Sequence, residues 1–310
     1  MKRSVLLSWI TVGFVYFLMF WGNLVSATGS GLACPDWPLC HGTVLPPPRP
    51  DIILEWGHRT LAAIAGVLIL TLIFQVFKSK DASTAPLKRA GRWLIILLFV
   101  QVLLGGTTVL LGLSPIVSTI HLIIATVVFS GLIAVAVAAT WGKGLVLHNS
   151  FKVQRLAKAG LIALIVQVAL GAMVRHNGFG LSCSRFPNCL ESFLPIPLNP
   201  GTALAFTHRW WGVLLLGIFI HLPLAARKTA PRLRGASIAL AILAVAQVLL
   251  GIATVHTGLH THMRATHAAV GYAIWGILFF IALRSGSFRF LWDASVDHRS
   301  HPGKGKAVHV

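Results

Sequence analysis

The stretch Gly22-Asn-Leu-Val-Ser-Ala-Thr-Gly-Ser-Gly-Leu-Ala-Cys34 is duplicated in the chain, where its pattern recurs as Gly171-Ala-Met-Val-Arg-His-Asn-Gly-Phe-Gly-Leu-Ser-Cys183. In each copy five residues then separate the cysteine from a second one, Cys40 or Cys189. Each copy also follows a long apolar run. The chain therefore contains two versions of one structural unit.

Further matches extend the duplication along the chain. Gly57-His58-Arg59 corresponds to Thr207-His208-Arg209, and Gln101-Val-Leu-Leu-Gly105 recurs unchanged as Gln247-Val-Leu-Leu-Gly251. A histidine stands 20 residues after each of these glutamines, at His121 and His267.

The composition is that of an integral membrane protein. Hydrophobic residues make up 56% of the 310 positions and charged residues only 11%, whereas soluble domains carry about 25% charged residues. Eight apolar runs are each near the ~20 residues that cross a bilayer as a helix. They cover about 5–25, 58–77, 93–112, 118–141, 159–175, 206–226, 237–255 and 265–283. The first run could be a signal peptide ending at 25–27, but its length favours a retained helix.

The sequence thus predicts an all-α integral membrane protein with eight transmembrane helices in two tandem, pseudo-symmetric four-helix bundles. We place the halves at 1–150 and 151–283 and expect a cytoplasmic tail at 284–310. Because each half crosses the membrane an even number of times, the two have the same orientation, as in parallel repeats. Each half has a long first outer loop, 26–54 or 176–205, of the kind that often covers a site.

Basic residues predict the orientation of the chain. Of the 26 Lys and Arg residues, 20 fall in the termini and the loops on one side, which places both termini in the cytoplasm of a cell-membrane protein. This pattern explains the net charge of +19 without a nucleic-acid partner, for which no motif is present. Six arginines lie at the outer face and need another explanation: Arg49, Arg59, Arg175, Arg185, Arg209 and Arg264.

Four repeat-related histidines indicate haem binding. His58, His121, His208 and His267 each stand near the start of a helix that runs from the outer face inward. Each half therefore brings imidazoles from two helices to one depth, which suits bis-imidazole ligation of haem iron. The alternative for a lone histidine is an interhelical hydrogen bond. Without a Cys-x-x-Cys-His motif, the haem is expected to be b-type.

The outer arginines and histidines supply further candidates. Arg59, Arg209 and Arg264 stand near the four histidines and are candidates to bind haem propionates. The loop histidines His256, His260 and His262 have a spacing that can hold copper or zinc, but the first half has no counterpart, so we leave them unassigned.

The four cysteines lie in outer loops, where disulfides persist. Their equal spacing predicts Cys34–Cys40 and Cys183–Cys189. We favour two structural disulfides, with a redox-active first pair as the alternative.

Glu55 distinguishes the two halves. It is expected to share a helix face with His58, three residues later, and the position that matches it in the second half is Ala205. An acidic first turn can simply complement the helix dipole, but a carboxylate in only one of two haem-binding halves indicates chemistry there, by proton relay or by stabilising a developing positive charge.

Four features together resemble haem A synthase in its bacterial eight-helix form. They are Thr28-Gly-Ser-Gly-Leu-Ala-Cys-Pro-Asp-Trp-Pro-Leu-Cys-His-Gly42, Glu55-Trp-Gly-His-Arg59, the Gln–His spacing and the second repeat with its two cysteines, and the resemblance spans about 5–283. It implies that the methyl group at ring position 8 of haem O becomes the formyl group of haem A, by successive hydroxylations and loss of water.

The resemblance also implies roles for individual residues. Glu55 would be the essential glutamate, His58 and His121 would hold the substrate haem, and His208 and His267 would ligate a haem b cofactor. The product would serve haem-copper terminal oxidases. A haem O synthase, an unidentified electron donor and membrane lipid are the expected partners, and a homo-oligomer is compatible with the sequence.

Two other classes of protein remain as alternatives. A dihaem b-type cytochrome that only transfers electrons would explain the histidines and the duplication but not Glu55. A haem or metal transporter would use the histidine-rich outer face, but neither inverted repeats nor broken helices are evident.

Overall fold

The chain folds into long α-helices. The computed structural model describes residues 2–79, 84–142, 146–147, 150–193 and 199–288; the predicted tail therefore lies outside the described residues from 289 onward. The long helices in these ranges are α1 (Lys2–Ala27), α2 (Pro50–Lys78), α3 (Ala85–Leu110), α4 (Pro115–Trp141), α5 (Phe151–His176), α6 (Pro200–Thr229), α7 (Arg234–His256) and α8 (Thr261–Arg284). Two short 3-10 helices, η3 (Phe179–Leu181) and η4 (Pro231–Leu233), flank α6.

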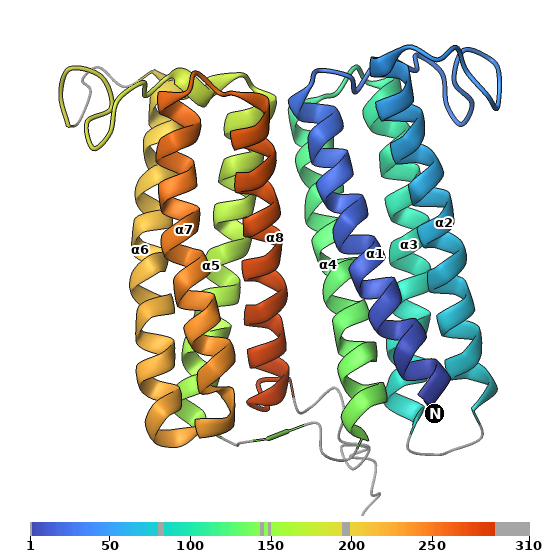
Figure 1. Cartoon of the computed structure of the whole chain (residues 1–310), viewed down its shortest axis with the longest axis vertical. Helices are drawn as coiled ribbons and strands as arrows, with labels where there is room; N and C mark the ends of the chain where they lie inside the picture. The colour runs from blue at the N-terminus through green and yellow to red at the C-terminus, as the bar shows by residue number, and fades with distance from the viewer. Residues whose placement is uncertain (1, 80–83, 143–145, 148–149, 194–198, 289–310) are drawn as a thin grey trace, which may run out of the picture.

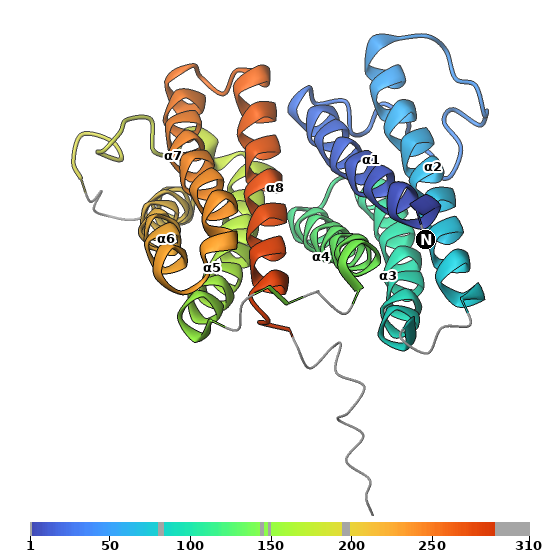
Figure 2. The ribbon, with the colours of Figure 1, turned by 60° about the horizontal axis from the view of Figure 1, so that its bottom comes forward.

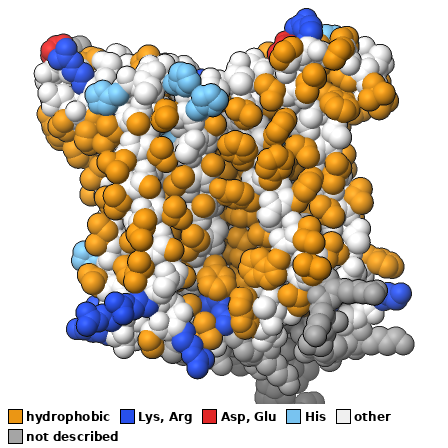
Figure 3. Space-filling view, viewed as in Figure 1, with side chains coloured by type: hydrophobic (Ala, Val, Ile, Leu, Met, Phe, Trp, Pro, Cys, Tyr) orange, Lys and Arg blue, Asp and Glu red, His pale blue; other side chains and the backbone are white. Residues whose placement is uncertain are grey.

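The prediction of eight membrane-spanning helices is confirmed. Within the described residues, 8 helices are long and apolar enough to cross a membrane. Hydrophobic side chains cover the middle of the molecule, whereas Lys and Arg side chains gather at its two ends (Figure 3). The protein is therefore an all-α, multi-pass membrane protein.

Several helices begin well before the apolar runs that predict them. Helices α2, α4 and α6 start at Pro50, Pro115 and Pro200. Proline suits a first helical turn because its missing N–H would have no partner there and its φ is already helical. The extra turns of α2 and α6 carry polar residues, which is why hydropathy alone sets these helix starts too late.

The helices lie in two groups (Figures 1 and 2). Helices α1–α4 form one group and α5–α8 the other, and the groups meet where α1 and α4 pack against α5 and α8. The interface contains polar contacts as well as apolar packing. The Trp275 Nε1 donates to the Ser130 hydroxyl at 2.7 Å, and the Tyr16 hydroxyl donates to the Ala269 carbonyl at 3.0 Å.

Both long loops lie at one end of the molecule, which we call the disulfide end (Figure 1). The loops run from 28 to 49 and from 177 to 199, and the predicted disulfides Cys34–Cys40 and Cys183–Cys189 are both present. The first helical turns of α2 and α6 meet these loops. The residues predicted to be functional therefore face loop backbone as well as neighbouring helices.

Candidate functional site

In the N-terminal half, His58 packs closely on the neighbouring helix. A Cβ atom added to Gly22 of α1 would lie 2.6 Å from His58 Cε1. This is shorter than the ~3.5–4.0 Å of an ordinary carbon contact, so only glycine leaves room for the ring. The second imidazole, on α4, is His121, whose Nε2 lies 3.2 Å from the Gln101 amide nitrogen on α3.

The C-terminal half repeats this arrangement. A Cβ on Gly171 of α5 would lie 2.7 Å from His208 Cε1. The Gln247 amide nitrogen of α7 lies 3.3 Å from Nε2 of His267 on α8. The recurring separation of Gln and His along the sequence therefore reflects direct contact between adjacent helices, and the glycine before each disulfide loop makes room for the other histidine of its half.

These residues fit a haem. The Nδ1 atoms of His58, His121, His208 and His267 are all buried and have no hydrogen-bond partner. Buried polar nitrogens are rarely left unpaired, and each exception needs a reason. Neutral imidazole is a common metal ligand, and bonding to a haem iron would give these nitrogens the partner that they lack. The donor set and the two close glycines thus suit a porphyrin held between helices.

A cavity of about 480 Å³ lies within the C-terminal half. Both His208 and His267 line it, and its walls are largely apolar. Ligand pockets of this size, with apolar walls and a few convergent polar groups, are typical binding sites for cofactors. Polar residues on the lining also include Gln167, Arg175, His176, Arg209, Gln247 and Arg264.

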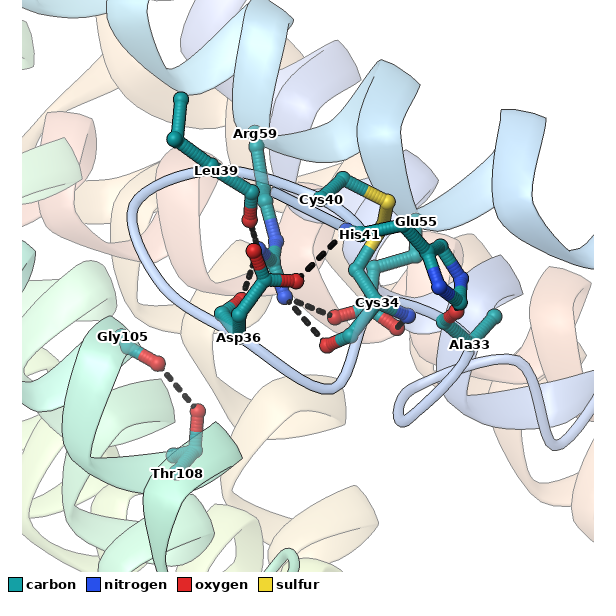
Figure 4. Close-up of polar contacts among 10 residues, drawn as sticks. All are labelled: Ala33, Cys34, Asp36, Leu39, Cys40, His41, Glu55, Arg59, Gly105 and Thr108. Carbon is teal, nitrogen blue, oxygen red and sulfur yellow. Dashed lines mark hydrogen bonds and ion pairs between the residues drawn. A yellow bond between two sulfur atoms is a disulfide. The ribbon is translucent and has the colours of Figure 1, made fainter. Parts of the chain in front are cut away.

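Glu55 is buried under the first disulfide loop (Figure 4). Only 4% of the residue is exposed. One carboxylate oxygen pairs with Arg59 Nη2 at 2.7 Å, and the other accepts a hydrogen bond from the Cys34 amide at 3.3 Å. The carboxylate thus connects α2 to the backbone of the loop at the disulfide itself.

Arg59 binds the same loop through three carbonyl groups. Its Nη1 donates to Asp36 O at 2.6 Å and Leu39 O at 2.5 Å, and its Nη2 donates to Cys34 O at 2.8 Å. Because Arg59 follows Glu55 by one helical turn, the pair fixes the loop to the start of α2.

Arg209 does the same in the second half without an acid. It donates hydrogen bonds to the carbonyls of Cys183, Arg185 and Asn188. The residue in the place of Glu55 is Ala205, which is buried. Anchoring of a disulfide loop therefore needs the arginine but not the carboxylate.

The first loop has a further anchor in Asp36. Its carboxylate accepts the Gly42 amide at 2.8 Å and the His41 amide at 2.6 Å. The hydrogen bond from Gly42 lowers the pKa of Asp36 below its ordinary value of 3.8, and the bond from His41 acts in the same direction. The loop also lays Trp37 on α3, where a Cβ on Gly106 would lie 2.9 Å from the indole ring. The loop thus covers the N-terminal half at the disulfide end.

The predicted site residues take up partly different partners from those expected. The side chain of Glu55 bonds to the loop, whereas His58 packs against α1. Arg59 and Arg209 bind loop carbonyls, so their contact with haem propionates stays a prediction. Among the described residues, no group of three His, Cys, Asp or Glu side chains is arranged to hold a metal ion. The loop histidines with metal-binding spacing, His256, His260 and His262, are therefore not arranged as a metal site.

Sequence reasoning missed four contributors to the site, two residues on the cavity lining and two glycines. Gln167 and Arg175 line the C-terminal cavity. The position of Arg175 at the outer face was a signal, but its hydrogen-bond partner, Asn23 of α1, was not foreseeable from spacing. The glycines at 22 and 171 lie in the repeated stretch, and the repeat alone gives no indication that they pack on histidine rings.

Comparison with known proteins agrees with this geometry. The family model COX15-CtaA, described as cytochrome oxidase assembly protein, matches residues 5–53 and 49–279. A protein of Bacillus pumilus named heme A synthase is 30% identical over 300 residues, covering 92% of this chain and 96% of that protein. Proteins of the same name from Bacillus licheniformis and Symbiobacterium thermophilum are each 28% identical, over 90% and 91% of this chain and 95% of each relative.

The matches span both halves, including the two histidine pairs, both disulfide loops and Glu55. From this coverage we conclude that the chain belongs to the COX15-CtaA family, the haem A synthases.

Proposed function

We propose that the protein oxidises the methyl group at ring position 8 of haem O to the formyl group of haem A. The N-terminal half would hold the substrate through His58 and His121. The C-terminal half would hold haem b through His208 and His267. Family membership and the names of the relatives support the reaction, and the unpaired imidazole nitrogens support the two haem sites.

One observation carries the division of labour between the halves. Both halves have a histidine pair and an arginine that anchors a disulfide loop, but among the residues that the structure describes a buried carboxylate, that of Glu55, is found in the N-terminal half alone. Ala205 shows that the scaffold is complete without that acid. The carboxylate therefore serves a purpose beyond the fold, in the half that would bind the substrate.

The conversion of a methyl to a formyl group removes four electrons and introduces one oxygen atom. Each of two successive hydroxylations would consume one dioxygen molecule together with two electrons and two protons from the electron donor, inserting one oxygen atom and releasing the other as water. The resulting geminal diol loses water to give the formyl group. Haem b, when bound, supplies one-electron transfer. Glu55 would carry the negative charge that stabilises positive charge developing at the oxidised carbon, or would accept a proton from the hydroxyl group. Arg59 and the Cys34 amide hold that carboxylate in a fixed position, so little reorganisation is required when charge develops.

We infer that both termini lie in the cytoplasm and that both haem sites lie near the outer face, and the distribution of Lys and Arg supports this orientation. A haem O synthase would supply the substrate, and haem-copper oxidases would use the product.

The test is co-expression with a haem O synthase in a host that lacks haem A, followed by extraction of the haems. The wild-type chain should yield formyl haem. Glu55→Gln should retain b-type haem and a folded loop, because the amide can still accept from Cys34, but should yield no haem A. The matched control is Glu191→Gln, which removes an exposed carboxylate paired with Arg185 in the other loop and should leave the yield unchanged.

Two results would contradict the proposal. Normal haem A yield from Glu55→Gln would refute the role of Glu55. Normal b-type haem with neither hydroxylated nor formyl haem from the wild-type chain would favour the alternative, a dihaem cytochrome that only transfers electrons.

A further inference from the structure

The six arginines at the outer face differ in their partners. Three form ion pairs: Arg49 with Asp51, Arg59 with Glu55 and Arg185 with Glu191. The other three, Arg175, Arg209 and Arg264, have no carboxylate within ion-pair distance in the described part of the chain, and all three line the C-terminal cavity. Cations at the edge of hydrocarbon are costly without a counter-charge. The ones that face the cavity therefore call for an anion from the ligand.

Of these three arginines, Arg175 is the one whose guanidinium has a buried nitrogen without a hydrogen-bond partner. Its Nη2 donates to the Asn23 carbonyl at 2.7 Å, and its Nη1 donates to the Asn23 side-chain oxygen. A guanidinium has five N–H donors, so this interaction leaves three, and the Nε among them is buried without any partner. A carboxylate is the group that best fits this arrangement, because it accepts two parallel bonds from one guanidinium.

Arg264 adds a second positive charge to the same place. Both Arg175 and Arg264 line the C-terminal cavity, and the Arg264 Nη1 donates to the Ala27 carbonyl of α1 at 3.2 Å. Two like charges that line one cavity are unfavourable unless negative charge is bound between or beside them. A porphyrin with two propionate groups supplies that charge.

Both arginines are anchored to α1, which belongs to the other half. Asn23 is 4% exposed, and its amide also donates to the Ala265 carbonyl of α8 at 3.3 Å. The preceding residue, Gly22, is the one that packs on His58. The repeat gives Ser26 in the place of Arg175 and Ala172 in the place of Asn23, so the first half cannot form the same bridge.

We propose that Arg175, with Arg264, is the carboxylate-binding site of the C-terminal cavity, and that Asn23 of α1 completes this site from the other half. The inference rests on the proposed function, because it takes the occupant of the cavity to be a haem. Helix α1 would then serve both halves. Its Gly22 packs on His58 of the N-terminal site, and the next residue, Asn23, holds Arg175, which binds the haem of the C-terminal site. Arg175 and Asn23 are positioning residues for the cofactor.

The test compares haem b with its dimethyl ester, in which both carboxylates are blocked. Binding to the full-length apo-protein is titrated by absorption in a His58→Ala background, so that the C-terminal site dominates. We expect the His58→Ala chain without further substitution, called the unmodified chain below, to bind the free acid at least tenfold more tightly than the ester. Arg175→Gln should reduce this ratio at least fivefold, Arg175→Lys should reduce it less, and Asn23→Ala should reduce it about threefold, because the guanidinium is then no longer held in place.

Arg185→Gln is the matched control, because it removes one positive charge from the disulfide end at an exposed position and should leave the ratio unchanged. Equal binding of acid and ester by the unmodified chain, a comparison that depends on no arginine variant, would overturn the inference. An unaltered ratio in Arg175→Gln would do the same. An unaltered ratio in Asn23→Ala would remove α1 from the site. Failure of the unmodified chain to bind haem b at all would instead refute the cofactor in the proposed function, and this inference with it.

Discussion

Replacing Gly171 with alanine should displace His208 and release the haem that we propose as the cofactor. The added Cβ would lie 2.7 Å from His208 Cε1 and 3.3 Å from its Nδ1. Restoring an ordinary contact of ~3.5–4.0 Å requires the ring to retreat by about 1 Å. Metal–ligand distances tolerate only about 0.2 Å. A shift of this size therefore breaks the ligation or forces the backbones of α5 and α6 apart.

The structure also gives the order of the effects. At Gly251 the added Cβ would lie 3.2 Å from His267 Cε1, so the ring need move only a few tenths of an ångström. Changes in the groups that support a metal ligand typically cost about 10–100-fold in affinity. We expect Gly171→Ala to fall at the upper end of this range and Gly251→Ala at the lower end.

The assay is the amount of b-type haem per purified chain, measured from the absorption spectrum of the reduced protein. Gly217→Ala in α6 is the matched control, because no atom lies within 4 Å of its added Cβ. An exposed helical Gly→Ala change otherwise stabilises a helix by up to about 1 kcal/mol, so neither variant should unfold for reasons of helix propensity. Full occupancy with an unaltered spectrum in Gly171→Ala would refute the assignment of His208 as a ligand packed on α5.

Two further predictions concern the disulfide loops. The pKa of Asp36 in the folded protein is lowered below its ordinary value of 3.8 by hydrogen bonds from the His41 and Gly42 amides. These bonds therefore stabilise the first loop while the pH is above 3.8. The stabilisation is lost as the pH falls below this value and through the lower pKa of the folded state. Pepsin should thus cut the first loop increasingly as the pH falls below 3.8, whereas the Asp36→Asn variant should be cut already at higher pH. Equal cutting of the wild-type and variant proteins across this pH range would contradict the role of Asp36. Arg209→Gln should open the second loop, but not the first, to proteolysis, because it removes a charged donor from three carbonyl groups. A hydrogen bond to a charged group contributes about 1.5–3 kcal/mol when well shielded. Unchanged protection of 183–189 would show that the disulfide alone maintains that loop.

The helices were predictable from the sequence because a membrane restricts the possible structures so strongly. An apolar run of about 20 residues has few alternatives to a spanning helix. Seven of the eight runs lie within helices of the structure, and the run 93–112 extends two residues past the end of α3 at Leu110. The starts of α2 and α6 were not predictable in this way, because their first turns lie at the polar end and are specified by Pro50 and Pro200.

The contacts of the site were predictable only in part. The duplication shows Gln101 and Gln247 at the same sequence separation from a histidine, and the structure explains this separation by direct contact between the two side chains. The partner of Arg175 lies 152 positions away in the sequence, and neither composition nor period contains that information. The targets of Arg59 depend on the path of a loop, which hydrophobic patterning does not specify.

The duplication supplies controls that a single bundle would lack. Arg59 and Arg209 both anchor a disulfide loop, so this anchoring does not depend on a residue that is present in only one half. Glu55 is such a residue in the N-terminal half, and Arg175 is such a residue in the C-terminal half. One adds a buried negative charge beneath a disulfide loop, and the other adds a positive charge on the lining of a cavity. A negative charge suits the half in which positive charge would develop on a reacting carbon. A positive charge suits the half that would keep a cofactor by its carboxylates and would favour the reduced, less positively charged form of its iron. The two halves thus differ in charge where an oxidising site and an electron-transfer site are expected to differ.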